Sequence, residues 1–161
     1  MSDYIIRESK PGEPSLVVHF YYKLFEKQFD FLPSTEQYFL HAMTDLFGNP
    51  TENNLFVVES NGEIVGSVCI VKLAENEAQL RLFGTNPVLQ GKGIGLELME
   101  IAMNFCREKE YNHIILWTID ICKVARHLYG KFGFKLTDTK PNTTWAKYSM
   151  VEEKWEYNAA E

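Results

Sequence analysis

A short glycine-rich segment carries the residues whose types and spacing are best suited to chemistry. Gln90-Gly91-Lys92-Gly93-Ile94-Gly95 joins a predicted strand to a predicted amphipathic helix. Three glycines in five residues allow a sharp turn and leave main-chain N–H groups uncovered by side chains. These N–H groups lie at the positive end of a helix, where a phosphate group is stabilised. The segment therefore predicts a phosphate-binding loop.

The spacing of the glycines excludes two common nucleotide loops. A Walker A loop requires Gly-x-x-x-x-Gly-Lys-Ser/Thr, which this segment lacks. A dinucleotide fingerprint requires Gly-x-Gly-x-x-Gly, whereas Gly91, Gly93 and Gly95 are spaced evenly by two. A tight strand-to-helix connection without a ligand is the alternative that the loop alone leaves open.

The elements around the loop predict an α/β protein of the mixed α+β kind. Ser34 and Gln37 form a Ser-x-x-Gln pattern, which predicts a capping box, and Asn61-Gly62 predicts a hairpin turn. Apolar periodicity then places the elements in the following order: strand 4–8, helices 14–31 and 35–47, strands 55–59, 64–71 and 78–85, helix 94–109, strand 113–118, helix 124–132, and strands 134–139 and 145–155. A mixed sheet with helices on both faces accommodates this order.

Composition indicates one domain, residues 1–161, with 45% hydrophobic content. The net charge of −6 does not favour nucleic-acid binding, which needs clustered lysine and arginine. We find no signal peptide at residues 1–4 and no run long and apolar enough for a membrane helix. Cys69, Cys106 and Cys122 are odd in number and lie within or beside apolar runs, so reduced thiols in a cytoplasmic protein are expected.

Two motifs together resemble the GNAT N-acetyltransferase family. The acetyl-CoA loop of that family reads Gln/Arg-x-x-Gly-x-Gly/Ala, and Gln90, Gly93 and Gly95 match it. Downstream the family carries Leu-Tyr-x-x-x-Gly-Phe, which matches residues 128–134. More loosely, the chain is similar to the acetyltransferase half of proteins that fuse this domain to a winged-helix regulator.

The resemblance implies the GNAT acyl-CoA N-acyltransferase fold, whose central mixed sheet is splayed between the fourth and fifth strands. Acetyl-CoA would enter this wedge, and its pantetheine arm would pair with Phe83, Gly84 and Thr85. Gly84-Thr85 is more polar than the branched apolar pair usual in the family. The pyrophosphate would rest after Gln90 on the main-chain N–H groups of Gly91, Lys92, Gly93, Ile94, Gly95 and Leu96.

The activity implied by the resemblance is transfer of an acetyl group from acetyl-CoA to a primary amine of a small molecule or protein, by direct attack in a ternary complex. Tyr129 would be the acid that protonates the leaving thiolate, and a core tyrosine is the alternative. Acetyl-CoA is the co-substrate; no metal, nucleic acid or membrane is implied, and dimers are common in the family. A catalytically weak acetyl-CoA-sensing module and another phosphate-binding α/β domain are the alternative functions.

The general base is not assigned by the resemblance. Some branches carry a glutamate where this chain has Trp117, which cannot accept a proton. Cys122 replaces an asparagine that often contacts CoA, so that contact is expected to be lost. Acceptor specificity is expected from residues 15–50 and 138–150. Four candidates for the base remain open, each with an ordinary structural alternative: Glu75, Glu77, Asp120 and His127.

Overall fold

A seven-stranded sheet of order β1-β2-β3-β4-β5-β7-β6 organises the protein. The computed structural model describes residues 3–159. In chain order the elements are β1 (Ile5–Glu8), α1 (Glu13–Phe29), α2 (Thr35–Thr44), the short 3-10 helix η1 (Asp45–Gly48), β2 (Asn54–Ser60), β3 (Glu63–Ala74), β4 (Glu77–Thr85), the 3-10 helix η2 (Pro87–Leu89), α3 (Ile94–Glu108), β5 (His113–Ile119), α4 (Lys123–Lys131), β6 (Lys135–Asn142) and β7 (Met150–Asn158). The predicted order of strands and α-helices is confirmed.

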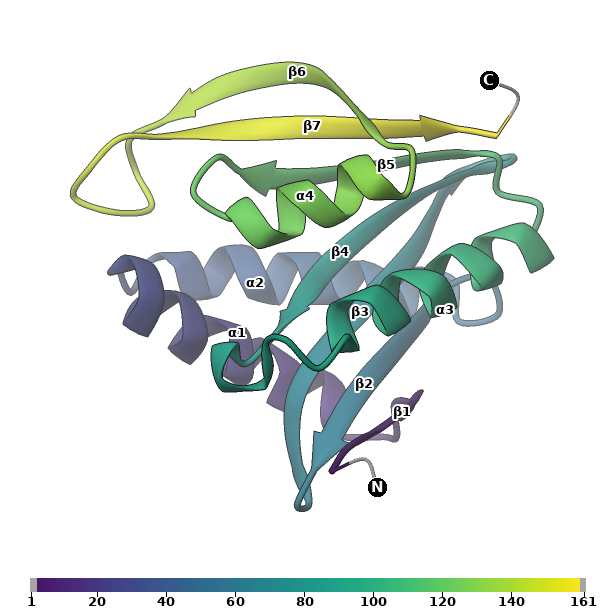
Figure 1. The fold of residues 1–161 in the computed structure, drawn as a ribbon, viewed down its shortest axis with the longest axis horizontal. Coiled ribbons are helices and arrows are strands. Elements are labelled where there is room, and N and C mark those ends of the chain that lie inside the picture. The colour runs from purple at the N-terminus through teal and green to yellow at the C-terminus, as the bar shows by residue number, and fades with distance from the viewer. Residues whose placement is uncertain (1–2, 160–161) are drawn as a thin grey trace.

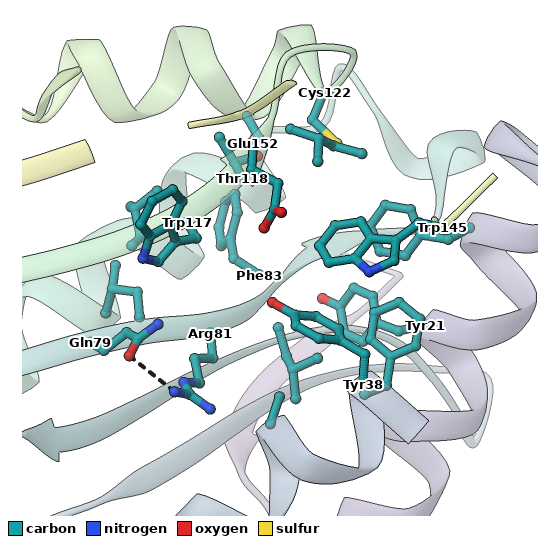
Figure 2. A pocket seen from close by; sticks show the side chains of 18 of the residues that line it. Tyr21, Tyr38, Gln79, Arg81, Phe83, Trp117, Thr118, Cys122, Trp145 and Glu152 are labelled. Carbon is teal, nitrogen blue, oxygen red and sulfur yellow. Dashed lines mark hydrogen bonds between the residues drawn. The ribbon is translucent and has the colours of Figure 1, made fainter. Parts of the chain in front are cut away.

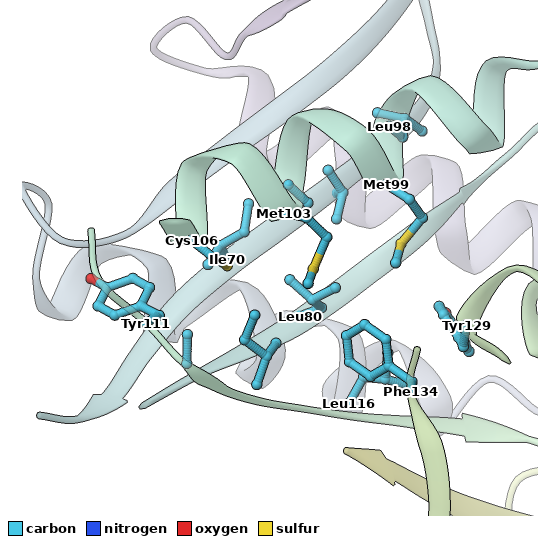
Figure 3. Packing of buried hydrophobic residues seen from close by; sticks show 14 of the residues in the cluster. Ile70, Leu80, Leu98, Met99, Met103, Cys106, Tyr111, Leu116, Tyr129 and Phe134 are labelled. Atoms are coloured by element: carbon cyan, nitrogen blue, oxygen red, sulfur yellow. The ribbon is translucent and has the colours of Figure 1, made fainter. Parts of the chain in front are cut away.

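Helices cover both faces of the sheet (Figure 1). The α3 and α4 side buries a cluster that includes Leu98, Met99 and Met103 of α3 against Leu80 and Leu116 of the sheet (Figure 3). A second cluster lies beneath α1 and α2 on the opposite face. Two separate apolar faces explain why the central strands contain long hydrophobic runs. Within residues 3–159, no helix combines the length and apolar character needed to cross a membrane.

The sheet opens between β4 and β5, as the resemblance predicted. These two strands are parallel and pair from Glu77 opposite His113 to Leu80 opposite Leu116, where the pairing ends. Immediately beyond this point β4 contains a bulge. Two features identify it: the register of β4 with β3 shifts, and Leu82 adopts a φ of 50°. The bulge turns the last residues of β4 away from β5, and the gap between the two strands widens in that direction (Figure 1).

Polar contacts from α1 and β3 hold the bulge from behind. The Ser67 hydroxyl donates to the carbonyl oxygen of Leu82 at 2.7 Å, and the Tyr21 hydroxyl donates to that of Gly84 at 3.1 Å. Both side chains are buried, so these bonds form away from competing water. The bulge is therefore fixed by tertiary contacts as well as by strand pairing.

The close approach of β3 to β4 behind the bulge requires glycine at position 66. A Cβ atom on Gly66 would lie 2.8 Å from the carbonyl oxygen of Gly84, which is main chain and cannot rotate away. We therefore expect Gly66→Ala to lower the free energy of unfolding by about 2 kcal/mol. Chemical denaturation measures this change, and Gly48→Ala, whose Cβ would meet nothing within 4 Å, is the control. Equal stability of the two variants would contradict the expectation.

Two local predictions are wrong. Ser34 has helical main-chain angles and its side chain makes no capping hydrogen bond, whereas a capping serine needs a non-helical main chain. The helix it was expected to start ends at Thr44 and continues as η1. Trp145 was expected in the last strand, but β7 begins at Met150 and Trp145 lies in the β6–β7 loop. Its carbonyl oxygen accepts a hydrogen bond from the N–H of Leu32 at 2.7 Å, which draws the loop toward the α1–α2 connection.

Candidate active site

The glycine-rich loop presents main-chain donors to solvent at the start of α3. Gly91 and Gly93 have φ angles of 87° and 78°, and a Cβ atom on either would meet nothing within 4 Å. Across residues 3–159, no protein acceptor is bonded to the main-chain N–H groups of residues 91–96. Gly93 caps the helix without a side-chain hydrogen bond. The loop thus has the open donors and the helix terminus that an anion site requires.

The segments singled out in the sequence converge at Gly95. A Cβ atom on Gly95 would lie 2.9 Å from Leu128 of α4 and 3.9 Å from the Phe83 ring of β4. The Phe83 ring in turn contacts the Tyr129 ring, with 5.7 Å between centroids. The loop, the unpaired end of β4 and the Leu-Tyr motif of α4 therefore form one continuous site.

The structure explains why Gly84 stands where a branched apolar residue was expected. A Cβ atom on Gly84 would lie 3.2 Å from the Tyr21 ring, so Tyr21 occupies the space that a branched side chain would need. The hydroxyl of Tyr21 bonds the Gly84 carbonyl as well. Thr85, the next residue, pairs with Gly66 of β3. The β4 end is shaped by an aromatic side chain from α1 in place of its own apolar pair.

Tyr129 is buried, and its hydroxyl has no hydrogen-bond partner within the described part of the chain. Its ring contacts Phe83, Phe134 and Trp155. Burial raises the pKa of Tyr129 far above its ordinary value, so the hydroxyl stays protonated at neutral pH. The residue also lines a cavity between β4 and β5. A buried, unpaired phenol that lines a cavity has a proton available for a ligand.

A cavity of about 560 Å³ occupies the gap between β4 and β5 (Figure 2). Its walls come from α1, α2, both open strands, α4 and the β6–β7 region, and aromatic rings dominate them: Tyr21, Phe25, Phe31, Tyr38, Phe39, Phe83, Trp117, Tyr129 and Trp145. Residues from both ranges expected to face the acceptor, 15–50 and 138–150, line it. The size suits a small ligand or the end of a longer one.

Glu152 was missed by the sequence reasoning. This residue of β7 lines the cavity, and Figure 2 shows its carboxylate pointing inward between the indole rings of Trp117 and Trp145. Its side chain is only 13% exposed. The amide of Asn142 donates to Oε2 at 3.2 Å. The alternation of side chains along the final strand was the available signal, but that strand was expected to start at Trp145, five residues before the observed start at Met150. The segment expected to face the acceptor therefore ended at residue 150, two residues before Glu152.

The four candidates for a base do not line the cavity. Glu77 contacts His113 at 3.4 Å, at the paired end of β4 and β5. Asp120 accepts a hydrogen bond from the N–H of Val151 at 3.0 Å and joins β5 to β7. Glu75 is in a solvated turn, and His127 is on the exposed side of α4. Each therefore has a structural or solvated role.

Cys122 and Trp117 also line the cavity. Burial raises the pKa of Cys122 to about 11, so its thiol is protonated at neutral pH and is a poor nucleophile. Lys140 makes a cation–π contact with the Trp117 ring, and its Nζ lies 4.7 Å from the ring centroid. Among residues 3–159, no group of three or more His, Cys, Asp or Glu side chains could hold a metal ion.

The arrangement of a splayed sheet, a glycine loop and a buried tyrosine corresponds to a known class of protein. Residues 18–134 match the family model described as the acetyltransferase (GNAT) family. The chain belongs to the GNAT acetyltransferase family.

Comparisons with individual proteins agree with this assignment. The chain is 33% identical over 89 residues to N-acetyltransferase family 8 member 2 of Rattus norvegicus, an alignment covering 52% of this chain and 39% of that protein. It is 34% identical over 86 residues to the uncharacterized N-acetyltransferase YjgM of Escherichia coli K12, with 52% of each covered. The chain thus spans about half or less of these relatives.

A solved structure shares the fold over nearly the whole chain. The yncA protein of Salmonella typhimurium, solved with its cofactor acetyl-CoA, superimposes with a TM-score of 0.77 at 13% identity. The superposition covers 98% of this chain and 95% of that one. At this identity the comparison supports the fold.

Proposed function

We propose that this chain, acting as one domain over residues 1–161, is an acetyl-CoA-dependent N-acetyltransferase that acetylates a primary amine. The observation that carries the proposal is the continuity of the site: open N–H donors at residues 91–96 lead along the unpaired end of β4 to a cavity lined by Tyr129. A cofactor with an anionic diphosphate and a thioester at the end of a flexible arm fits this order of features. The N-acetyltransferase names of the relatives agree with it.

In this proposal the cofactor uses main-chain groups throughout. The diphosphate accepts hydrogen bonds from the loop N–H groups after Gln90, where the α3 terminus adds favourable potential. The pantetheine arm lies beside Phe83, Gly84 and Thr85, whose edge toward β5 is unpaired. Lys92 extends from the same loop to its rim, where its Nζ lies 3.6 Å from the Asp3 carboxylate. The thioester then enters the cavity.

The acceptor approaches from the other side of the cavity and attacks directly in a ternary complex. Its neutral nitrogen forms a bond to the thioester carbon, while a main-chain N–H near the β4 bulge polarises the carbonyl oxygen. The C–S bond then breaks, and the Tyr129 hydroxyl gives its proton to the leaving sulfur. The tyrosine regains a proton from solvent. The products are the amide and CoA thiol.

Calorimetry and a thiol-release assay test this function together. We expect the protein to bind acetyl-CoA in preference to ATP or NAD, and primary amines to accelerate CoA release. Preference for a nucleotide would overturn the cofactor assignment. Acetyl-CoA binding with no acceleration by any amine would favour the sensing module.

A further inference from the structure

We infer that the cavity accepts a primary amine carried on a flat apolar body without a neighbouring carboxylate, and that Glu152 binds the ammonium group and takes its proton. This inference rests on the proposed function, because it assigns the acceptor side of the same site. Three features of the cavity support it: the negative charge of Glu152, the aromatic walls, and the contacts that already hold the cationic side chains Arg81 and Lys140.

Glu152 has one carboxylate oxygen available for a ligand. Asn142 and Lys140 both contact Oε2, at 3.2 Å and 4.0 Å, and within residues 3–159 no hydrogen bond is made to Oε1. The Lys140 side chain is 57% exposed and lies over Trp117, so it neutralises the carboxylate only weakly. A carboxylate withdrawn from water is stabilised by a cation at short range. An incoming ammonium group supplies that cation.

Asn142 fixes Glu152 and the facing wall at the same time. Its side-chain oxygen accepts hydrogen bonds from the N–H groups of Thr144 and Trp145, at 3.0 Å and 3.1 Å. Its amide nitrogen donates to Glu152. Since Asn142 is buried, one side chain sets the distance between the carboxylate and the Trp145 indole. The ammonium position and the aromatic wall are thus held in a fixed relation.

The walls beside Glu152 suit a flat apolar group. Trp145 contacts Tyr38 with 4.8 Å between ring centroids and Phe31 with 5.8 Å. Trp117 lies on the opposite side of the carboxylate (Figure 2). Aromatic surfaces stabilise both apolar rings and adjacent cations. An amine attached to a ring or a similarly flat body would bury its apolar part here.

The cations of the cavity are poorly placed to bind a carboxylate on the acceptor. Arg81 is bonded to Asp45 at 2.5 Å and to Gln79 at 3.1 Å, which occupies both terminal guanidinium nitrogens and leaves only its buried Nε without a partner among residues 3–159. Lys140 is held on Trp117. A carboxylate next to the reacting amine would therefore meet the negative charge of Glu152 without a dedicated partner. An α-amino acid is disfavoured relative to the simple amine.

The proton transfers balance. The acceptor enters as R–NH₃⁺ and gives one proton to Glu152, which passes it to solvent. The neutral amine then forms the C–N bond, and the nitrogen gives up a second proton to solvent as the C–S bond breaks. Tyr129 protonates the sulfur and is itself reprotonated. Overall, R–NH₃⁺ and acetyl-CoA give the amide, CoA thiol and one proton.

Three matched compounds test the acceptor class on the unaltered protein: 2-phenylethylamine, phenylalanine and phenylalanine amide. We expect kcat/KM for 2-phenylethylamine to exceed that for phenylalanine by about 30-fold. Phenylalanine amide has a group of similar size to the carboxylate but without its negative charge, so its kcat/KM should be close to that of 2-phenylethylamine. Equal or faster acetylation of phenylalanine would overturn the inference while leaving the proposed function intact.

Glu152→Gln tests the carboxylate, with Glu156→Gln on the same strand as the matched control. Glu156 contacts His113 and does not line the cavity. We expect Glu152→Gln to lower kcat/KM for 2-phenylethylamine about 30-fold and to weaken its calorimetric binding, with acetyl-CoA affinity unchanged. The control should retain both. Unchanged amine binding and turnover in Glu152→Gln would overturn the assignment of Glu152 to the acceptor site. If the unaltered protein did not bind acetyl-CoA, the proposed function itself would be overturned.

Discussion

Gly93→Glu is expected to abolish acetyl-CoA binding, with a dissociation constant raised more than about 100-fold. The new side chain would extend from the N-cap of α3 into open space, where the diphosphate is proposed to bind. It would bring a negative charge against another negative charge and cover the loop donors. Isothermal titration calorimetry with acetyl-CoA measures the effect.

The matched control is Gly12→Glu. Gly12 is the N-cap of α1, has a φ of 89°, and also has nothing within 4 Å of an added Cβ. Both substitutions therefore carry the same left-handed strain, about 1 kcal/mol, and the same new charge. We expect similar melting temperatures for the two variants and normal acetyl-CoA affinity for Gly12→Glu alone. Normal affinity in Gly93→Glu would remove the loop from the cofactor site.

Tyr129→Phe is expected to lower kcat about 100-fold while leaving acetyl-CoA affinity unchanged. The hydroxyl is the only group removed, and within residues 3–159 it has no hydrogen-bond partner. Its loss should therefore leave stability unchanged, because no buried bond is broken. Since burial raises the pKa of Tyr129, the hydroxyl stays protonated from neutral to mildly alkaline pH, and the variant should show the same deficit across that range. Steady-state kinetics and a thermal melt give the two readouts.

Tyr111→Phe provides the contrasting control. The Tyr111 hydroxyl donates to the carbonyl oxygen of Glu52 at 2.7 Å, away from the cavity. Removing it should cost about 1 kcal/mol of stability and leave kcat unchanged. If Tyr129→Phe retained both its steady-state and its single-turnover rate, Tyr129 would have no part in the chemistry.

Local sequence signals predicted most of the elements because each is set by short-range chemistry. Asn61 and Gly62 have φ angles of 53° and 80°, so the hairpin signal was correct. The start of α3 at Ile94 and its buried stripe followed from the three- and four-residue spacing of apolar side chains. Ser34 failed because the same pattern of residues is compatible with a helical main chain, and only the preceding turn decides which conformation forms.

The candidate site likewise has one side that the sequence predicted and one side that it did not. The cofactor side depends on glycine positions and on a motif in α4, both contiguous in the chain, so residues 83–85, 90–96 and Tyr129 could be proposed before any coordinates. The acceptor side depends on Asn142, Trp145 and Glu152, whose relation is created by the return of the β6–β7 loop toward the α1–α2 connection. No spacing between these residues encodes that contact.

By itself, the sequence determined the order of strands and helices, the loop with its open N–H groups, and through its two motifs the family of the protein. The tertiary structure alone decided which carboxylate enters the cavity, since Glu152 and Glu153 are adjacent and chemically identical. Side chains alternate across a strand, so Glu152 lines the cavity while Glu153 is bonded to Arg126 at 2.7 Å. The register of β7 against β5 and β6 fixes that choice, and register is a property of paired strands.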